Sequence, residues 1–247
     1  MKSLLWGLVI LIIGLTLIVF LISNLSKFDF RFRADQPDIV YEEDRSDLPR
    51  VSFQIVRPGR ISIVNHDRQP VNLTRWIIKG NIGSYMIVQG AAVYNPSGFN
   101  AVGDIFLEPG AALHIYSQAG PINQHFQVNV CLGYLENTMV FNPPLPKICP
   151  RFSQEEIASL SGACQRYLRS LPRCALPEDN VPFWNNYACA EKLRQLNYKS
   201  CFEKYSEDPD FLTGEWRLYG SGQVLDPLHD QVLLLDTENR VVDQYGY

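Results

Sequence analysis

The clearest chemical feature of the chain is its six cysteines, which all lie between residues 131 and 201. An even number of closely spaced cysteines is typical of disulfides formed in an oxidising compartment. The alternative is a zinc site, but the chain has no C-x-x-C pair. The sequence therefore predicts six disulfide-bonded cysteines in an extracytoplasmic domain. They are Cys131, Cys149, Cys164, Cys174, Cys189 and Cys201.

The spacing of the cysteines disfavours some pairings. On one continuous helix, Cys189 and Cys201 would lie about 18 Å apart, beyond the reach of a disulfide. A bridge between Cys164 and Cys174 is unfavourable unless the chain folds back between them. We expect bridges that join the two helices predicted below, or that join these helices to the β-rich part of the chain through Cys131 or Cys149. Several pairings stay open.

The histidines do not converge on one another or on carboxylates in the pattern of a zinc site or a catalytic triad. His66 and His229 each precede an aspartate in a predicted turn, whereas His114 lies in a predicted strand, where packing is expected. The fourth is His125. The sequence therefore predicts no metal-binding histidine.

The C-terminal aspartates are spread over turns and a strand, whereas a calcium loop places its oxygen ligands within about a dozen residues. The chain also lacks the common nucleophile, zinc-protease and nucleotide-binding motifs. We therefore expect no catalytic residue, no metal and no cofactor. The aspartates are Asp226, Asp230, Asp236 and Asp243.

One aromatic residue is a candidate for binding a partner. Trp184, in the segment PFWNNY between the two predicted helices, is the best candidate for an exposed aromatic anchor. The sequence nevertheless favours packing of its ring against these helices. Trp76 and Trp216 lie within strand-like runs and are expected in the core.

Composition and charge limit the class of protein and its partners. The chain has 247 residues, of which 46% are hydrophobic and 19% charged, as in globular proteins. Its net charge is −4, and its arginines and lysines are scattered. The absence of a basic patch in the sequence argues against nucleic acid. The predicted partner is a protein or a cell-surface polymer.

The N-terminal segment predicts a membrane anchor. Residues 4–22 carry no charge and are long enough as a helix to cross most of a hydrocarbon core of about 30 Å. The alternative is a cleaved signal peptide, but this run exceeds the usual apolar region and no A-x-A-like site follows it. We expect an uncleaved anchor at residues 1–25, followed by a linker at residues 26–50.

The orientation of the anchor depends on the cysteines. Lys27, Arg31 and Arg33 follow the apolar run, against the rule that positive charge stays inside. The cysteines require an oxidising compartment for everything after the anchor. We therefore expect a single-pass membrane protein with a cytoplasmic N-terminus and an extracytoplasmic domain.

From Val51 onward the chain shows short β-rich runs separated by turn residues, a pattern typical of an antiparallel sandwich or barrel. The C-terminal residues 229–247 read as a closing hairpin. The runs before it are residues 51–56, 60–65, 71–80, 85–94, 104–118, 125–135 and 214–220.

A cysteine-bearing helical insert at about residues 142–212 interrupts the β pattern. Ser153 and Glu156 have the spacing of a capping box, and apolar residues then recur at helical spacing until Pro172 ends the helix. A second amphipathic stretch covers about residues 185–205. Such a small insert needs disulfides, because it cannot bury a large core.

Three β segments together resemble the lamin tail domain family. Asn239 stands where the family has glycine in the last hairpin turn, and the helical insert is not part of the family pattern. Matching residues are Asn65, Pro70, Val71, Leu73 and Trp76 in the first segment, Leu107, Pro109, Gly110 and Leu113 in the second, and Asp230, Val232, Leu234, Asp236, Val241, Val242, Asp243 and Tyr247 in the third.

The resemblance covers residues 51–140 and 213–247. It implies an immunoglobulin-like antiparallel β-sandwich, interrupted here by the insert, in one domain of residues 51–247. The family includes membrane-anchored and secreted bacterial proteins in which the domain is a binding or tethering module. It implies no catalytic residue.

These observations predict a non-enzymatic, membrane-anchored binding or scaffolding module at the cell surface. The alternative function is a subunit or accessory domain of an extracellular enzyme, with its site in the helical insert. Capture of nucleic acid at the surface is a third hypothesis.

Overall fold

The computed structural model describes residues 48–95, 98–178 and 182–247. The predicted anchor at residues 4–22 and most of the predicted linker lie outside the described residues. Within the described ranges, no helix is both long and apolar enough to cross a membrane. Strand β1 (Val51–Arg57) begins where the β pattern predicts it, and Leu48 before it is already buried.

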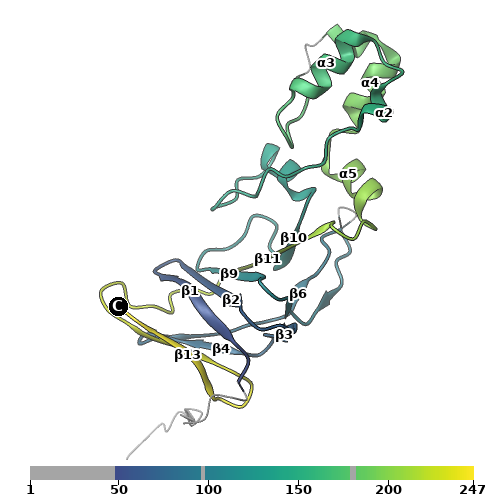
Figure 1. The fold of residues 1–247 in the computed structure, drawn as a ribbon. Coiled ribbons are helices and arrows are strands. Elements are labelled where there is room, and N and C mark those ends of the chain that lie inside the picture. Colours follow the sequence, from purple (N-terminus) through teal and green to yellow (C-terminus); the bar gives the residue numbers. More distant parts are fainter. Residues whose placement is uncertain (1–47, 96–97, 179–181) are drawn as a thin grey trace, which may run out of the picture. The chain divides into compact units, whose positions relative to one another are not determined.

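The described chain is mainly β, with strands in three sheets (Figure 1). The seven-stranded sheet has the order β1, β2 (Arg60–Asn65), β9 (Ala112–Tyr116), β11 (Leu212–Tyr219), β10 (Phe126–Asn129), β6 (Gly90–Ala91) and β7 (Val102–Gly103). The four-stranded sheet has the order β13 (Val241–Gly246), β12 (Gln231–Leu235), β4 (Ile77–Lys79) and β5 (Ser84–Met86), and the third sheet pairs β3 (Val71–Asn72) with β8 (Phe106–Leu107).

The seven-stranded sheet is mixed, so the prediction of a purely antiparallel architecture is wrong. Strand β11 runs parallel to β9, and β10 runs parallel to β6. Parallel neighbours need a long crossover between them. For β9 and β11 this connection contains β10 and the whole helical insert, and it lets the chain return beside β9 in the same direction.

Several of the β-rich runs contain less strand than predicted, and two of them show a local reason. The run at residues 71–80 divides into β3 and β4, because Arg75 has a positive φ of 71° and Thr74 N–H donates to Asn72 Oδ1 at 2.9 Å. The run at residues 125–135 is strand only as far as Asn129, and a 3₁₀ helix η1 (Leu132–Asn137) follows. In both places an asparagine side chain, Asn72 or Asn129, accepts a backbone N–H that would otherwise be available to pair with a neighbouring strand.

The two helices predicted for the insert are each broken in two. The capping box of Ser153 and Glu156 is confirmed at the start of the first pair. The breaks come at Ser161 and Asn197, whose side chains accept backbone N–H groups and start new helices. Figure 1 shows α2, α3 and α4 grouped together. The helices are α2 (Gln154–Ile157), α3 (Gly162–Ser170), α4 (Tyr187–Arg194) and α5 (Tyr198–Tyr205), with a 3₁₀ turn η2 (Pro182–Asn185) before α4.

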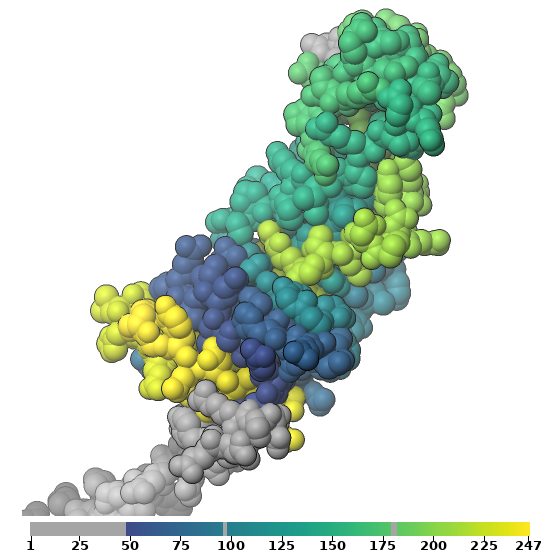
Figure 2. Space-filling view, in the orientation of Figure 1, coloured from purple at the N-terminus to yellow at the C-terminus, as the bar shows by residue number. Residues whose placement is uncertain are grey.

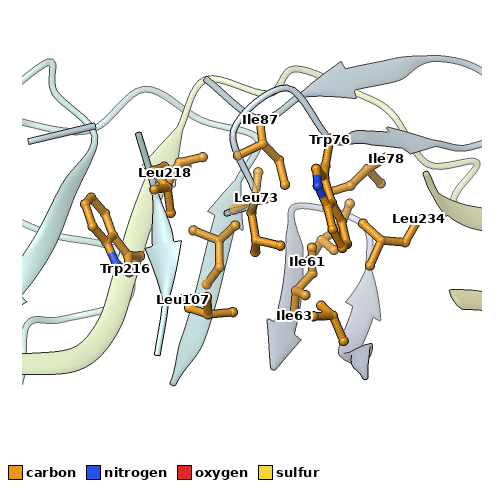
Figure 3. Packing of buried hydrophobic residues seen from close by; sticks show 14 of the residues in the cluster. Ile61, Ile63, Leu73, Trp76, Ile78, Ile87, Leu107, Trp216, Leu218 and Leu234 are labelled. Atoms are coloured by element: carbon orange, nitrogen blue, oxygen red, sulfur yellow. The ribbon is translucent and has the colours of Figure 1, made fainter. Parts of the chain in front are cut away.

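The largest hydrophobic cluster joins all three sheets. Trp76 and Trp216 are both buried in it, as their positions in strand-like runs predict. Figure 3 shows Leu73 and Ile87 close to Trp76 and Ile78 in this cluster. Side chains of this size stabilise a fold by about 1.5–3 kcal/mol each when fully buried. The core therefore holds the seven-stranded sheet against the other two sheets.

The C-terminal strand is fastened at both ends. Tyr247 exchanges two backbone hydrogen bonds of 3.1 Å with Asp230, and Asp243 Oδ2 accepts the Phe53 N–H of β1 at 2.7 Å. In Figure 2 the yellow C-terminal residues lie against the blue surface of the first strands. Asn239 has a φ of 63° in the hairpin turn, so asparagine takes the left-handed conformation usually given to glycine.

Candidate functional site

The outer face of the seven-stranded sheet carries a row of polar side chains. Along β2, Ile61 and Ile63 point into the main core, so Arg60 and Ser62 point to the opposite face. The register places Ser62 beside His114 and His114 beside Arg217. Neighbouring β2, β9 and β11 thus bring these polar groups together on one face.

Ser62 and His114 form a hydrogen-bonded pair, with 2.8 Å between Oγ and Nδ1. Burial lowers the pKa of His114 to about 4, and the nearby cations Arg60 and Arg217 oppose its protonation further, while Glu215 acts in the opposite direction. Ser62 is fully buried and also accepts the Arg60 Nε–H at 3.3 Å. A substrate has no path to this hydroxyl, so the pair orients Arg60 and does not act as a nucleophile and base.

Arg217 fastens the start of the helical insert to the sheet. Its guanidinium is buried and donates to the carbonyl oxygens of Pro143 at 2.8 Å and Pro144 at 3.1 Å. Its Nε donates to Glu215 Oε1 at 2.6 Å. These contacts occupy all three nitrogens of its guanidinium group, so Arg217 has a structural role beside the site.

An aromatic cluster covers the outer face next to Arg217. The rings of Tyr116 and Tyr219 lie 5.2 Å apart between centroids, and Phe126 lies 6.0 Å from Tyr219. The Phe141 ring meets Phe126 edge to face at 6.3 Å. Burial raises the pKa of Tyr219 to about 12. These packed aromatic rings form an apolar surface next to the polar side chains of β2, β9 and β11.

Arg60 is held in place without a negative partner. Its guanidinium lies 5.8 Å from the centre of the Tyr116 ring, and one of its nitrogens lies 3.4 Å from His114 Nδ1. None of these groups is an anion. In the part of the chain that the structure describes, neither Arg57 nor Arg60 forms an ion pair with a carboxylate. The positive charge of Arg60 is therefore oriented, and no carboxylate among the described residues forms an ion pair with it.

Two hollows meet at the turn that connects β1 and β2, which we call the Arg57–Arg60 turn. The hollow on the outer face, of about 420 Å³, is named the Asn142 hollow. The hollow at the inner-face end of the sheet, of about 340 Å³, is named the Gln223 hollow. Both are lined by residues 57–60 and by Ser117, whose N–H donates to Gly59 O at 3.2 Å. No acidic side chain among the described residues lines either hollow.

All six cysteines form disulfides, as predicted. The bridge between Cys164 and Cys189 joins α3 to α4, and Cys131 joins the end of β10 to Cys201 in α5. The two pairings disfavoured by spacing do not occur, although Cys189 and Cys201 lie on two separate helices and not on one continuous helix. The bridges are Cys131–Cys201, Cys149–Cys174 and Cys164–Cys189, with Cα–Cα distances of 5.8, 5.2 and 6.1 Å.

Trp184 packs against the helices of the insert. It lies in η2, is half-buried beside the cluster around Cys164 and Cys189, and donates its Nε1–H to Glu178 O at 2.8 Å. This is the packing alternative recognised in the sequence. Its role as a partner-binding anchor stays a prediction.

The C-terminal aspartates accept backbone N–H groups. Asp230 accepts from Asn81 at 2.8 Å and from Asp226 at 2.7 Å, and Asp236 accepts from Glu238 and from Arg240 at 2.9 Å each. In the described ranges, no group of three or more His, Cys, Asp or Glu residues is placed to hold a metal ion. These carboxylates stabilise turns.

The sequence did not single out Arg57, Arg60 or Tyr116 as site residues. One signal was present, because the alternation in β2 and β9 puts Arg60, Ser62 and Tyr116 on the face opposite the core. Their connection to Arg217 depends on the parallel pairing of β9 with β11. No protein-family model, curated protein or solved structure matches the chain. Its function must therefore be inferred from its own residues and their geometry.

Proposed function

We propose that the protein is a membrane-anchored, extracytoplasmic module that binds a ligand at the cell surface without catalysing a reaction. The observation that carries the proposal is the Arg57–Arg60 turn. It presents two arginines without carboxylate partners among the described residues, one of them oriented by Ser62, His114 and Tyr116. A guanidinium fixed beside a hollow is suited to bind an anionic group.

The proposed fold is an immunoglobulin-like sandwich of the lamin tail type. The shared core of the seven- and four-stranded sheets supports two packed layers. Residues of the resemblance also have structural roles that suit a common fold. Asn65 Nδ2 donates to the carbonyls of Gln69 at 2.9 Å and Leu107 at 2.7 Å, and this ties β2 to β8.

The proposed location rests on the disulfides and on the apolar run. Three bridges are typical of a protein that folds in an oxidising compartment. The uncharged residues 4–22 are long enough to anchor the chain in the membrane. Together they favour a domain held outside the membrane by its N-terminus.

An enzyme with a site in the insert has less support. The hollow beside α5, of about 330 Å³, is lined by Lys204, Tyr205 and Phe152. Lys204 pairs with Glu156, and its Nζ lies 4.6 Å from the centre of the Tyr205 ring. A paired lysine over an aromatic ring is a poor general base, and no histidine lines this hollow among the described residues.

The location is tested by protease treatment of intact cells that express the full-length chain. The expected result is release of a disulfide-bonded fragment that contains the Arg57–Arg60 turn. Full protection of the domain until the cells are lysed would contradict the proposed orientation.

The binding site is tested by retention of the full-length chain, in lipid nanodiscs, on immobilised cell envelopes. The Arg57→Gln/Arg60→Gln variant is expected to lose at least nine-tenths of the retention. The matched control is Arg166→Gln/Arg194→Gln, which removes the same charge from exposed helical positions. Equal retention of wild type and the turn variant would refute the proposed site.

A further inference from the structure

We infer that the ligand of the Arg57–Arg60 turn is an acidic polysaccharide whose chain occupies both hollows. This inference rests on the proposed binding function and names the chemical class of the ligand. Three properties of the turn carry it: its charge, its two hollows, and the side chains that line them.

The charge of the turn selects an anionic ligand. Arg57 is exposed, and Arg60 is half-buried against the Tyr116 ring. The chain as a whole has a net charge of −4, so this local excess of positive charge differs from the rest of the molecule. Guanidinium groups bind carboxylates, sulfates and phosphates through paired hydrogen bonds. The ligand therefore carries at least one carboxylate, sulfate or phosphate group in the part that binds at the turn.

The two hollows select an extended ligand. The Asn142 hollow lies on the outer face beside Tyr116, and the Gln223 hollow lies on the inner face beside Ile61 and Ile115. Both are lined by Arg57 and Arg60, so one ligand that passes the tip of the hairpin lies beside these two residues in each hollow. A single small anion fills part of one hollow only. A polymer with a repeated anionic unit fits the arrangement better.

The lining favours hydroxyl groups over nucleobases. Hydroxyl and amide side chains line the hollows, and such groups exchange hydrogen bonds with sugar hydroxyls. The aromatic ring at the site, Tyr116, is buried beneath Arg60 and offers no stacking surface, whereas proteins that bind single-stranded nucleic acid stack bases on aromatic rings. The side chains are Ser117, Gln118 and Asn142 in the Asn142 hollow, and Ser117, Ser221 and Gln223 in the Gln223 hollow.

The test measures binding of full-length protein in nanodiscs to polygalacturonate, with dextran as the uncharged polysaccharide and galacturonic acid as the single unit. Polygalacturonate is expected to bind at least tenfold more tightly than either. Arg57→Gln/Arg60→Gln is expected to weaken this binding at least tenfold, whereas Arg166→Gln/Arg194→Gln leaves it within twofold. Binding weakens as salt rises, because the contacts are ionic.

A blocking variant tests whether one chain uses both hollows. Gln223 is exposed, so Gln223→Trp fills its hollow and leaves Arg57 and Arg60 unchanged. The expected result is at least fivefold weaker binding of polygalacturonate with unchanged binding of galacturonic acid. Equal binding of the polymer by this variant would overturn the two-hollow arrangement.

The identity of the polymer is tested with polyglutamate and with oligothymidylate at matched charge. If either binds as tightly as polygalacturonate, the polysaccharide assignment is wrong. The proposed binding function then still stands, provided that Arg57→Gln/Arg60→Gln reduces retention on cell envelopes. If that variant retains full binding to the envelopes, the proposed site itself fails.

Discussion

The Phe53 N–H donates to Asp243 Oδ2 at 2.7 Å, and this bond joins the first described strand, β1, to the last, β13. The two residues belong to different sheets, with β1 in the seven-stranded sheet and β13 in the four-stranded sheet. The same C-terminal strand buries Val241 and Val242. The edge of the domain where β1 meets β13 therefore depends on residues at both ends of the described chain.

A chain that ends at Asp236 is expected to lose its cooperative unfolding transition, because it lacks β13 and the contacts of β13 with β12 and β1. Asp243→Asn is a milder change and is expected to lower the free energy of unfolding by about 1–2 kcal/mol, since it weakens one charged hydrogen bond. Urea unfolding of the full-length protein followed by tryptophan fluorescence measures both effects. Asp210→Asn, at an exposed position, is the control. A cooperative transition at an unchanged urea concentration in the truncated protein would contradict the prediction.

Gly133→Ala is expected to destabilise the protein by about 1–3 kcal/mol, the usual cost of overpacking a core. A Cβ atom at this position would lie 2.4 Å from Cys174 Sγ and 2.9 Å from Pro146 O. Neither neighbour moves easily, because Cys174 is bridged to Cys149. Gly103→Ala is the matched control, since a Cβ there meets nothing within 4 Å. Thermal unfolding of both variants checks the prediction, and equal melting temperatures would contradict it.

The three bridges are expected to contribute unequally to stability. The Cys131–Cys201 bridge closes a sequence separation of 70, against 25 for Cys164–Cys189. Loop-closure entropy then predicts a loss of about 4 kcal/mol for Cys131→Ser/Cys201→Ser and about 3.5 kcal/mol for Cys164→Ser/Cys189→Ser. Urea unfolding gives both values. The reverse order would show that strain or residual structure outweighs loop length.

The domain is expected to lose stability as the pH falls from about 6.5 to about 4. Burial lowers the folded-state pKa of His114 to about 4, and burial also lowers the pKa of His125. As the pH falls through this window, the two histidines bind protons in the unfolded chain before they do so in the folded protein. The unfolded state is thereby favoured, so the stability that the neutral histidines contribute at higher pH is lost. His114→Gln is expected to flatten this part of the pH profile. Parallel profiles for wild type and His114→Gln would contradict this role.

The local parts of the fold could be predicted from the sequence. The β-rich runs at residues 51–56 and 60–65 and the capping box at Ser153 are signals within a few residues, and each describes what the structure contains. The breaks at Ser161 and Asn197 were missed because the apolar periodicity continues across them. There the side-chain cap competes with helix continuation and wins.

The candidate site could be predicted only in part, because it is built by non-local pairing. Arg60 and Tyr116 are placed on one face by the local alternation of β2 and β9. Arg217 reaches this face through a parallel pairing across the insert, and no pattern within either strand specifies that partner. The carbonyls of Pro143 and Pro144 that hold Arg217 depend on the path of the chain between the elements.

The placement of the insert between β9 and β11 also determines the order in which the strands and disulfides can form during synthesis. A ribosome makes β9 long before β11, so the edge of β9 waits for its neighbour until residues 117–211 have followed. Cys131 waits for Cys201 over nearly the same interval, whereas the bridges at Cys149 and Cys164 can close earlier. The two shorter bridges can therefore form before β11 has been made, while the β9 edge of the large sheet still lacks this neighbour.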